Sequence, residues 1–135
     1  MENVMKKFLT CVLALSMTYT TVYAEDADIA GALDHPDRPC ADKENDARRM
    51  PLEVLEFAGL QTGMSVLELE AGGGYYTEII SRAVGGDGNV ILQHAPGLMG
   101  FVGDGIDVRT AGGRLGNVEV RITDFDALAA ADNSV

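Results

Sequence analysis

Residues 64–80 read MSVLELEAGGGYYTEII, and this stretch predicts the order strand, glycine turn, helix. The apolar run 64–69 is typical of a buried strand. Three consecutive glycines follow at 72–74. Apolar side chains then recur at helical spacing over residues 75–84, and two further glycines end this predicted helix. Such a unit brings backbone N–H groups and a helix N-terminus against a ligand.

The glycine run predicts that a ligand comes close to the backbone of the turn. Glycine is costly in chain entropy, so three in a row are expected where the chain needs positive φ or where a Cβ would block a ligand. Glu68 lies at the carboxyl end of the predicted strand, where ligands bind in open α/β sheets. Its carboxylate can accept hydrogen bonds from the amino group or the ribose hydroxyls of a nucleoside-like ligand.

Two more strands are predicted after this helix. Residues 89–93 are an apolar run, and residues 118–123 alternate apolar and polar side chains. The connection 95–117 carries seven glycines, which predicts a loose helix or a partly mobile segment. Upstream, residues 50–58 predict a short helix with Pro51 in its first turn.

The pieces around the glycine turn resemble one protein family in their order and spacing. The strand that ends in Glu68 and the run 72–78 resemble the first motif of the class I S-adenosylmethionine (SAM)-dependent methyltransferases. More narrowly, the chain is similar to a group of exported bacterial predicted methyltransferases over residues 35–88, with a weaker continuation to the end. The further pieces that carry this resemblance are Arg38-Pro39, the Asp/Arg-rich segment 42–49, the segment 51–55 and Thr62-Gly63-Met64.

The resemblance implies a Rossmann-like α/β fold with three layers. We expect the chain to supply the N-terminal half of it, with about three strands, because the family's fourth strand and its acceptor pocket have no counterpart here. The expected organisation is a signal peptide at 1–24, a polar N-terminal arm at 25–50, and a cofactor-binding half-domain at 51–135. The arm is expected to be extended and to lead into a helix, which the resemblance places at 42–49.

The resemblance also implies which residues bind the cofactor, SAM. In the family an acidic residue after the third strand contacts the adenine amino nitrogen, and an apolar neighbour packs on the ring. The expected cofactor-binding residues are Glu68, Ala71, Gly72, Gly73, Gly74, Tyr76, Thr77, His94, Asp124 and Phe125. The catalytic residues and the methyl acceptor are not indicated.

Two positions depart from the usual pattern. The acidic residue that commonly ends the second strand and holds ribose hydroxyls is replaced by His94, preceded by Gln93, and either side chain can bond a hydroxyl. Glu70 stands where many methyltransferases have glycine. Its carboxylate either attracts the positive sulfonium or points to solvent, and we expect solvent.

The first 24 residues predict a secretory signal. Lys6 and Lys7 precede an apolar core, and residues 22–24 offer the small side chains that a signal peptidase reads. The core is too short for a transmembrane helix. We therefore expect an exported chain, periplasmic or secreted, that has no stable membrane span after cleavage.

The composition narrows the possible partners. The chain carries a formal net charge of −11, whereas nucleic acid and anionic lipid attract clustered Lys and Arg. A neutral or cationic small molecule is the more fitting partner. Irregularly spaced acidic residues predict a solvated surface and no metal site: Asp26, Asp28, Asp42, Glu44 and Asp46. The oligomeric state is not indicated.

Four functions remain open. The first is SAM-dependent methyl transfer to an unknown acceptor, and the second is a catalytically inactive, truncated methyltransferase-like binding module. The third is an NAD- or FAD-type site, but the third glycine of that fingerprint is Thr77 here and the acid precedes the turn at Glu68. The fourth is a glycine turn with no ligand. We favour the first.

Overall fold

The computed structural model describes residues 24–128. The predicted signal peptide, apart from Ala24, and the segment 129–135 lie outside the described residues. In the part that is described, no helix has both the length and the apolar character needed to cross a membrane.

Three parallel strands form one sheet in the order β1-β2-β3. Their bounds are Ser65–Leu69 for β1, Asn89–His94 for β2 and Val118–Ile122 for β3. Each predicted strand is thus confirmed to within one residue at either end. Parallel strands joined by helical connections are the arrangement that a Rossmann-like α/β fold requires.

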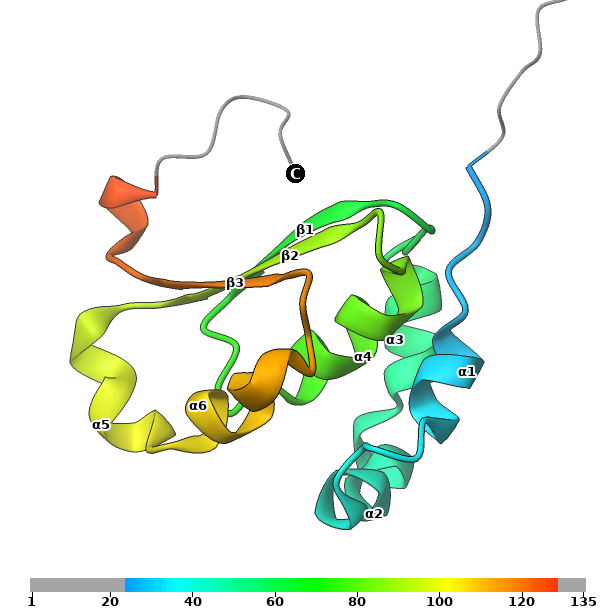
Figure 1. Cartoon of the computed structure of the whole chain (residues 1–135), viewed down its shortest axis with the longest axis horizontal. Helices are drawn as coiled ribbons and strands as arrows, with labels where there is room; N and C mark the ends of the chain where they lie inside the picture. The colour runs from blue at the N-terminus through cyan, green and yellow to red at the C-terminus, as the bar shows by residue number, and fades with distance from the viewer. Residues whose placement is uncertain (1–23, 129–135) are drawn as a thin grey trace, which may run out of the picture.

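Figure 1 shows the helices α1, α3, α4 and α6 on the same side of this sheet. The helices before β1 are α1 (Ile29–Asp34), α2 (Cys40–Arg49) and α3 (Pro51–Phe57), and α4 (Tyr75–Val84) joins β1 to β2. After β2 come η1 (Pro96–Leu98), α5 (Met99–Val102), α6 (Gly105–Thr110) and η2 (Ala111–Gly113), and η3 (Phe125–Ala127) follows β3. Residues 24–128 therefore supply the sheet and one helical layer of the three-layer fold.

The hydrophobic core lies between α4 and one face of the sheet. That face presents a row of three valines in register, Val66, Val90 and Val118. Against it pack the buried apolar residues of α4, which are Ile79, Ile80, Ala83 and Val84. The helix predicted over 75–84 is confirmed with these bounds, because its apolar stripe has a sheet face to cover it.

The segment before α2 contains a helix, α1, and is not extended as predicted. Ile29 and Ala32 of α1 are buried in the core, where this helix packs against α4 and α3. The side chain of Asp28 caps the helix by accepting a hydrogen bond from the amide of Gly31 at 2.8 Å. The prediction was wrong because it gave more weight to the nearby prolines than to the short i, i+3 apolar spacing of Ile29 and Ala32.

The glycine-rich connection between β2 and β3 folds as two short helices and two 3₁₀ turns. Its only buried apolar anchors among the described residues are Ile106 and Leu115. The prediction of a loose helix is right about the helical character, and the structure divides that helix at Gly103, where φ is 63°. Glycine takes this left-handed conformation without steric cost.

A buried carboxylate on α4 holds this connection in place. The Glu78 side chain is fully buried and meets Arg82 at 2.8 Å, Arg109 at 2.6 Å and Arg114 at 2.8 Å. Burial alone would favour the neutral acid, but the hydrogen bonds from Arg82 and Arg109 outweigh it and hold the pKa of Glu78 below its usual value. The Glu78 carboxylate therefore joins three segments, which are α4, α6 and the loop before β3.

Glu78→Gln is expected to destabilise the protein strongly. The amide keeps the shape of the side chain but removes the charge that compensates three arginines, so the free energy of unfolding should fall by about 3–5 kcal/mol. Glu56→Gln, at an exposed position on α3, is the matched control and should change it by less than about 0.5 kcal/mol. Urea unfolding at pH 7 followed by circular dichroism measures both. Equal stabilities of the two variants would contradict the role assigned to Glu78.

Candidate functional site

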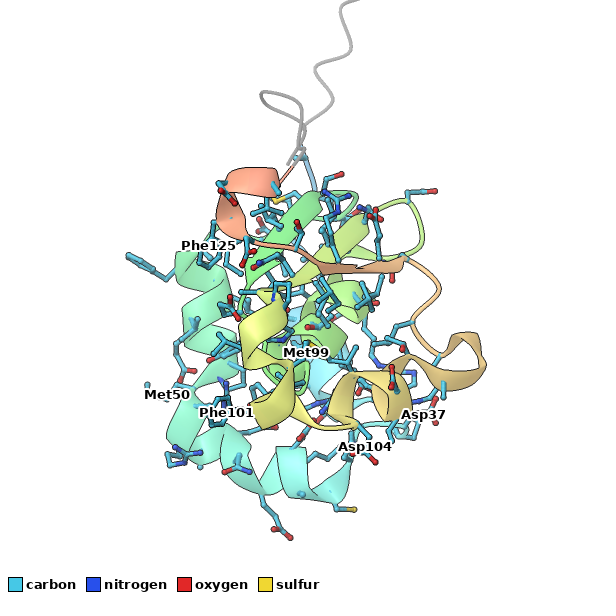
Figure 2. All side chains as sticks on the ribbon, turned by 90° about the vertical axis from the view of Figure 1, so that its left-hand side faces the viewer. Asp37, Met50, Met99, Phe101, Asp104 and Phe125 are labelled. Atoms are coloured by element: carbon cyan, nitrogen blue, oxygen red, sulfur yellow. The ribbon has the colours of Figure 1, made fainter. Side chains whose placement is uncertain are left out.

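The glycine turn lies at the carboxyl edge of the sheet, between β1 and α4. Figure 2 faces this edge, with Phe101 and Phe125 on the segments that follow β2 and β3. Gln93, which is fully buried, joins the strand ends. Its side-chain amide donates to the carbonyl of Thr123 at 2.7 Å, and its side-chain oxygen accepts from the amide of Glu70 at 3.3 Å. Gln93 thus joins the ends of the strands through its side-chain oxygen and one of its two side-chain N–H groups.

Two side chains hold the carbonyls of the turn. The Nε2 atom of His94 lies 3.0 Å from the Gly72 carbonyl oxygen, and Nε of Arg109 donates to the Gly73 carbonyl at 2.7 Å. Gly74 has a φ of 78°, and a Cβ there would lie 2.8 Å from Cδ of Arg109, so this position requires glycine. Within residues 24–128 the amide N–H groups of Gly72 and Gly73 have no hydrogen-bond acceptor. They are free to bind a ligand.

Glu68 is half-buried at the end of β1. Its carboxylate accepts a hydrogen bond from the hydroxyl of Thr77 at 2.5 Å. Burial raises the pKa of Glu68 to about 7, although the Thr77 hydrogen bond and the nearby His94 act in the opposite direction. Glu68 therefore exchanges its proton near neutral pH. Thr77 is fully buried beneath it.

Glu70 is paired with His94, which corrects the expectation that its carboxylate points to solvent. One carboxylate oxygen lies 2.9 Å from Nδ1 of His94, and the other accepts from the amide of Ala95 at 3.1 Å. Since Nε2 of His94 already faces the Gly72 carbonyl, both ring nitrogens are occupied within the protein. The Glu70 side chain is 26% exposed, and a carboxylate that accepts two hydrogen bonds retains lone pairs for a ligand.

Two cavities flank the glycine turn. The first, on the β2 side, has a volume of about 250 Å³ and is lined by Glu70, Gly72, Gly73, His94, Leu98, Phe101 and Val102. The second, on the β1 side, has a volume of about 340 Å³, and its lining includes Arg49, Glu68, Glu70, Ala71 and Tyr76. The structure thus brings six of the predicted site residues to these two cavities: Glu68, Ala71, Gly72, Gly73, Tyr76 and His94.

The remaining predicted residues lie apart from the cavities. Gly74 and Thr77 are buried behind the turn. Asp124 and Phe125 follow β3 at the same edge, but both are exposed and neither lines either cavity. Their contact with an adenine ring stays a prediction.

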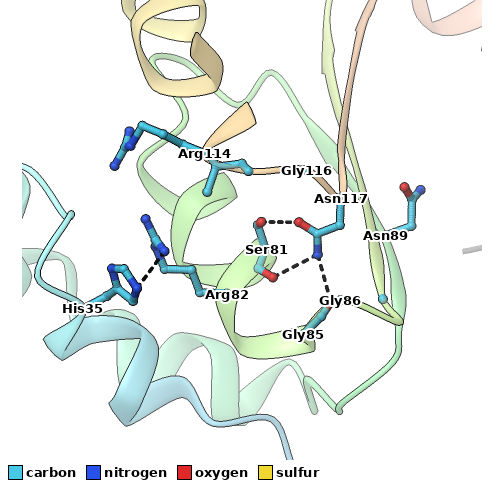
Figure 3. A pocket seen from close by; sticks show the side chains of 11 residues that line it. His35, Ser81, Arg82, Gly85, Gly86, Asn89, Arg114, Gly116 and Asn117 are labelled. Atoms are coloured by element: carbon cyan, nitrogen blue, oxygen red, sulfur yellow. Dashed lines mark hydrogen bonds between the residues drawn. The ribbon is translucent and has the colours of Figure 1, made fainter. Parts of the chain in front are cut away.

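A larger cavity of about 630 Å³ lies at the opposite, amino edge of the sheet (Figure 3). Its polar groups are used by the fold. Asn117 donates to the carbonyls of Ser81 and Gly85, both at 3.0 Å, while Arg82 and Arg114 bind Glu78. The glycine turn, and not this cavity, is therefore the candidate ligand site.

An ion-pair cluster attaches α2 to the first turn of α4. The buried Arg38 donates to both carboxylate oxygens of Asp46, at 2.7 and 2.9 Å, and the Tyr75 hydroxyl donates to Asp46 at 2.5 Å. The hydrogen bond from Arg38 holds the pKa of Asp46 below its usual value. Asp42 lies 2.8 Å from Arg109. Two members of the acidic segment are thus paired with arginines, contrary to the expectation of a wholly solvated surface.

Sequence reasoning missed the arginines that build this site. Arg38 was noted only within the Arg-Pro motif, and Arg109 had no local signal, because its partners lie more than thirty residues away in the chain. In the described part of the chain, no group of three or more His, Cys, Asp or Glu side chains is placed to hold a metal ion.

Comparison with known proteins gives three findings. The family model of protein-L-isoaspartate(D-aspartate) O-methyltransferases matches residues 34–125. The chain is 36% identical over 81 residues to the ubiquinone/menaquinone biosynthesis C-methyltransferase UbiE of Hydrogenovibrio crunogenus, a match that covers 60% of this chain and 31% of that protein. A SAM-dependent methyltransferase from Aquifex aeolicus is 28% identical with a TM-score of 0.55, over 73% of this chain and 53% of that one. The chain therefore spans between a third and about half of the length of these relatives.

Glu68→Gln is expected to change how stability depends on pH. The folded chain keeps the Glu68 proton up to about pH 7, whereas the unfolded chain releases it near pH 4.5. Raising the pH between these values therefore destabilises the folded wild type, since the folded state binds more protons than the unfolded state. The variant has no such ionisation. Between pH 4.5 and pH 7, the free energy of unfolding of the variant should therefore rise relative to that of the wild type by on the order of 2 kcal/mol.

Urea unfolding at a series of pH values from 4.5 to 8 measures this difference. Glu53→Gln, at an exposed position on α3, serves as the control. A gap between Glu68→Gln and the wild type that stays constant across the series would contradict the raised pKa of Glu68.

Proposed function

Because the chain belongs to the protein-L-isoaspartate(D-aspartate) O-methyltransferase family, we propose that it binds SAM at the glycine turn and transfers the methyl group to an acceptor. The observation that carries this proposal is the turn itself. Its free amides at Gly72 and Gly73 lie between two cavities that open at the carboxyl edge of a parallel sheet. This edge is where ligands bind in open α/β folds.

The cavity on the β2 side suits the adenosine end of the ligand. Its apolar side chains, Leu98 and Phe101, can pack against the flat adenine ring. The Glu70 carboxylate, which comes from β1, lies beside His94 at the end of β2. We propose that Glu70 accepts hydrogen bonds from the ribose hydroxyls, in place of the acid that commonly ends the second strand.

Under this proposal, the chain promotes methyl transfer mainly by positioning the cofactor and the acceptor. SAM supplies an electrophilic methyl group when it is bound, and transfer requires that this group be held in line with the acceptor nucleophile. The Glu70 carboxylate places negative charge beside the turn, and Glu68 adds to this charge as it ionises near pH 7. The acidic chain as a whole also favours a cationic ligand. Both features support a sulfonium ligand.

The acceptor is not part of the proposal. The matched family is named for O-methylation and one relative for C-methylation, so these names do not agree on an acceptor atom.

Calorimetric titration of the purified protein with S-adenosylhomocysteine tests the binding step, and we expect a dissociation constant in the micromolar range. Gly73→Val should weaken binding at least tenfold, because Gly73 lines the cavity and an added side chain there occupies ligand space. The variant should still fold, since Gly73 has no positive φ and an added Cβ meets no atom within 4 Å. Gly86→Val, at the opposite edge of the sheet with equally open surroundings, is the matched control.

A folded wild type that does not bind S-adenosylhomocysteine would overturn the proposal. Binding of NADH in its place would favour the dinucleotide reading. Binding of SAM without release of S-adenosylhomocysteine, across a panel of O-, N- and C-nucleophiles, would favour the non-catalytic module.

We also propose that residues 1–24 direct export of the chain, on the strength of their basic, apolar and small-residue regions. Expression in a Gram-negative host should yield periplasmic protein whose intact mass corresponds to a chain that begins at Glu25. Protein of full mass recovered from the cytoplasm would contradict this proposal.

A further inference from the structure

Arg49, the last residue of α2, is a cation fixed in place by two aromatic rings. Its guanidinium carbon lies 4.0 Å from the ring centroid of Tyr75 and 5.0 Å from that of Tyr76. The two rings pack edge to face at 5.0 Å. Tyr75 is held by Asp46, and the Tyr76 hydroxyl donates to the Arg49 carbonyl at 3.0 Å. These contacts restrict the guanidinium before any ligand binds.

Arg49 differs from most arginines of the protein because it has no carboxylate partner among the described residues. The arginines that do pair with a carboxylate are Arg38, Arg82, Arg109, Arg114 and Arg121. In an acidic chain, an ordered guanidinium without a carboxylate is available for an external anion. The planar fork of arginine suits a carboxylate, which it can bind through two parallel hydrogen bonds.

The surroundings of Arg49 match one kind of ligand group. The guanidinium lines the cavity on the β1 side of the glycine turn together with the carboxylates of Glu68 and Glu70. Arg49 and these two carboxyl groups, of which Glu68 is only partly ionised at pH 7, are complementary to a zwitterion, whose carboxylate would meet Arg49 and whose ammonium would meet a glutamate. Both cavities also have apolar lining residues, and the one on the β2 side includes Glu70 and His94. Among the described residues, only the cavity on the β1 side of the turn has an arginine in its lining.

We propose that Arg49 binds the carboxylate of the α-amino acid end of the ligand. This inference rests on the proposed SAM binding, since SAM and S-adenosylhomocysteine carry adenosine at one end and an α-amino acid at the other.

Two ligands that differ only in the amino acid end test the proposal. S-adenosylhomocysteine carries this end, whereas 5′-methylthioadenosine keeps the adenosine thioether and lacks it. Arg49→Ala should weaken binding of S-adenosylhomocysteine about 10- to 100-fold, the range expected for a charge-assisted hydrogen-bond pair. It should change binding of 5′-methylthioadenosine less than about twofold. Arg49→Lys, which keeps the charge and loses the fork, should fall between.

The neighbouring Arg48 offers a matched control. It is exposed on the same helix, where it donates to Asn45 at 3.1 Å, and it does not line the cavity. Arg48→Ala should leave the affinities for both ligands unchanged. Calorimetry on the full chain measures all four proteins.

The outcomes separate this inference from the proposed function. A wild type that binds neither ligand overturns both. If the wild type binds both ligands and Arg49→Ala weakens them equally, Arg49 only supports the tyrosines and the inference is overturned alone. Should Arg49→Ala fail to fold, the wild type is titrated with the carboxyl methyl ester of S-adenosylhomocysteine. At least tenfold weaker binding of the ester supports the inference, and equal binding overturns it.

Discussion

The carboxylate of Glu78 places the strongest physical constraint on this fold. A buried charge is tolerated only when opposite charges and hydrogen bonds surround it, and α4 itself provides just one of the three arginines. The others come from α6 and from the loop before β3. The glycine-rich connection must therefore fold back onto α4. Arg109, which pairs with Glu78, also lies against Gly74 and donates to the Gly73 carbonyl. The Glu78 carboxylate therefore fixes both the glycine-rich connection and, through Arg109, the glycine turn.

The carboxyl edge of the sheet shows how a family site can be rebuilt with different residues. The second strand ends in His94, whose nitrogens are occupied by Glu70 and by the Gly72 carbonyl. The Glu70 carboxylate, which directly follows β1, lies beside His94 at this edge. Glu70 adopts a φ of 50°, which non-glycine residues seldom do. The backbone at Glu70 thus takes a conformation that favours glycine, and it carries the side chain that pairs with His94.

The elements of the sheet could be predicted because their signals are local. The apolar runs of β1 and β2 and the helical stripe of α4 each appear within ten residues of sequence. The glycine turn was located correctly for the same reason. The short helix α1 was missed, since six residues carry too little periodicity to outweigh the prolines that follow.

The parts of the site that could not be predicted depend on contacts between distant segments. Glu78 and Arg109 are 31 residues apart, and Tyr75 and Asp46 are 29 apart. No spacing rule links such pairs before the topology is known. Asp46 in particular resembled one more surface acid, and only the fold shows that it meets both Arg38 and Tyr75.

The tyrosine pair beside Arg49 has an optical consequence. The chain has no tryptophan and four tyrosines, and Tyr75 and Tyr76 are the two that belong to residues 24–128. The near-ultraviolet absorbance and intrinsic emission of this part of the chain therefore arise almost entirely at the junction of α2 and α4. A change in tyrosine absorbance or emission that precedes the loss of helical signal during unfolding would report that α2 has separated from α4 while the helices are still formed.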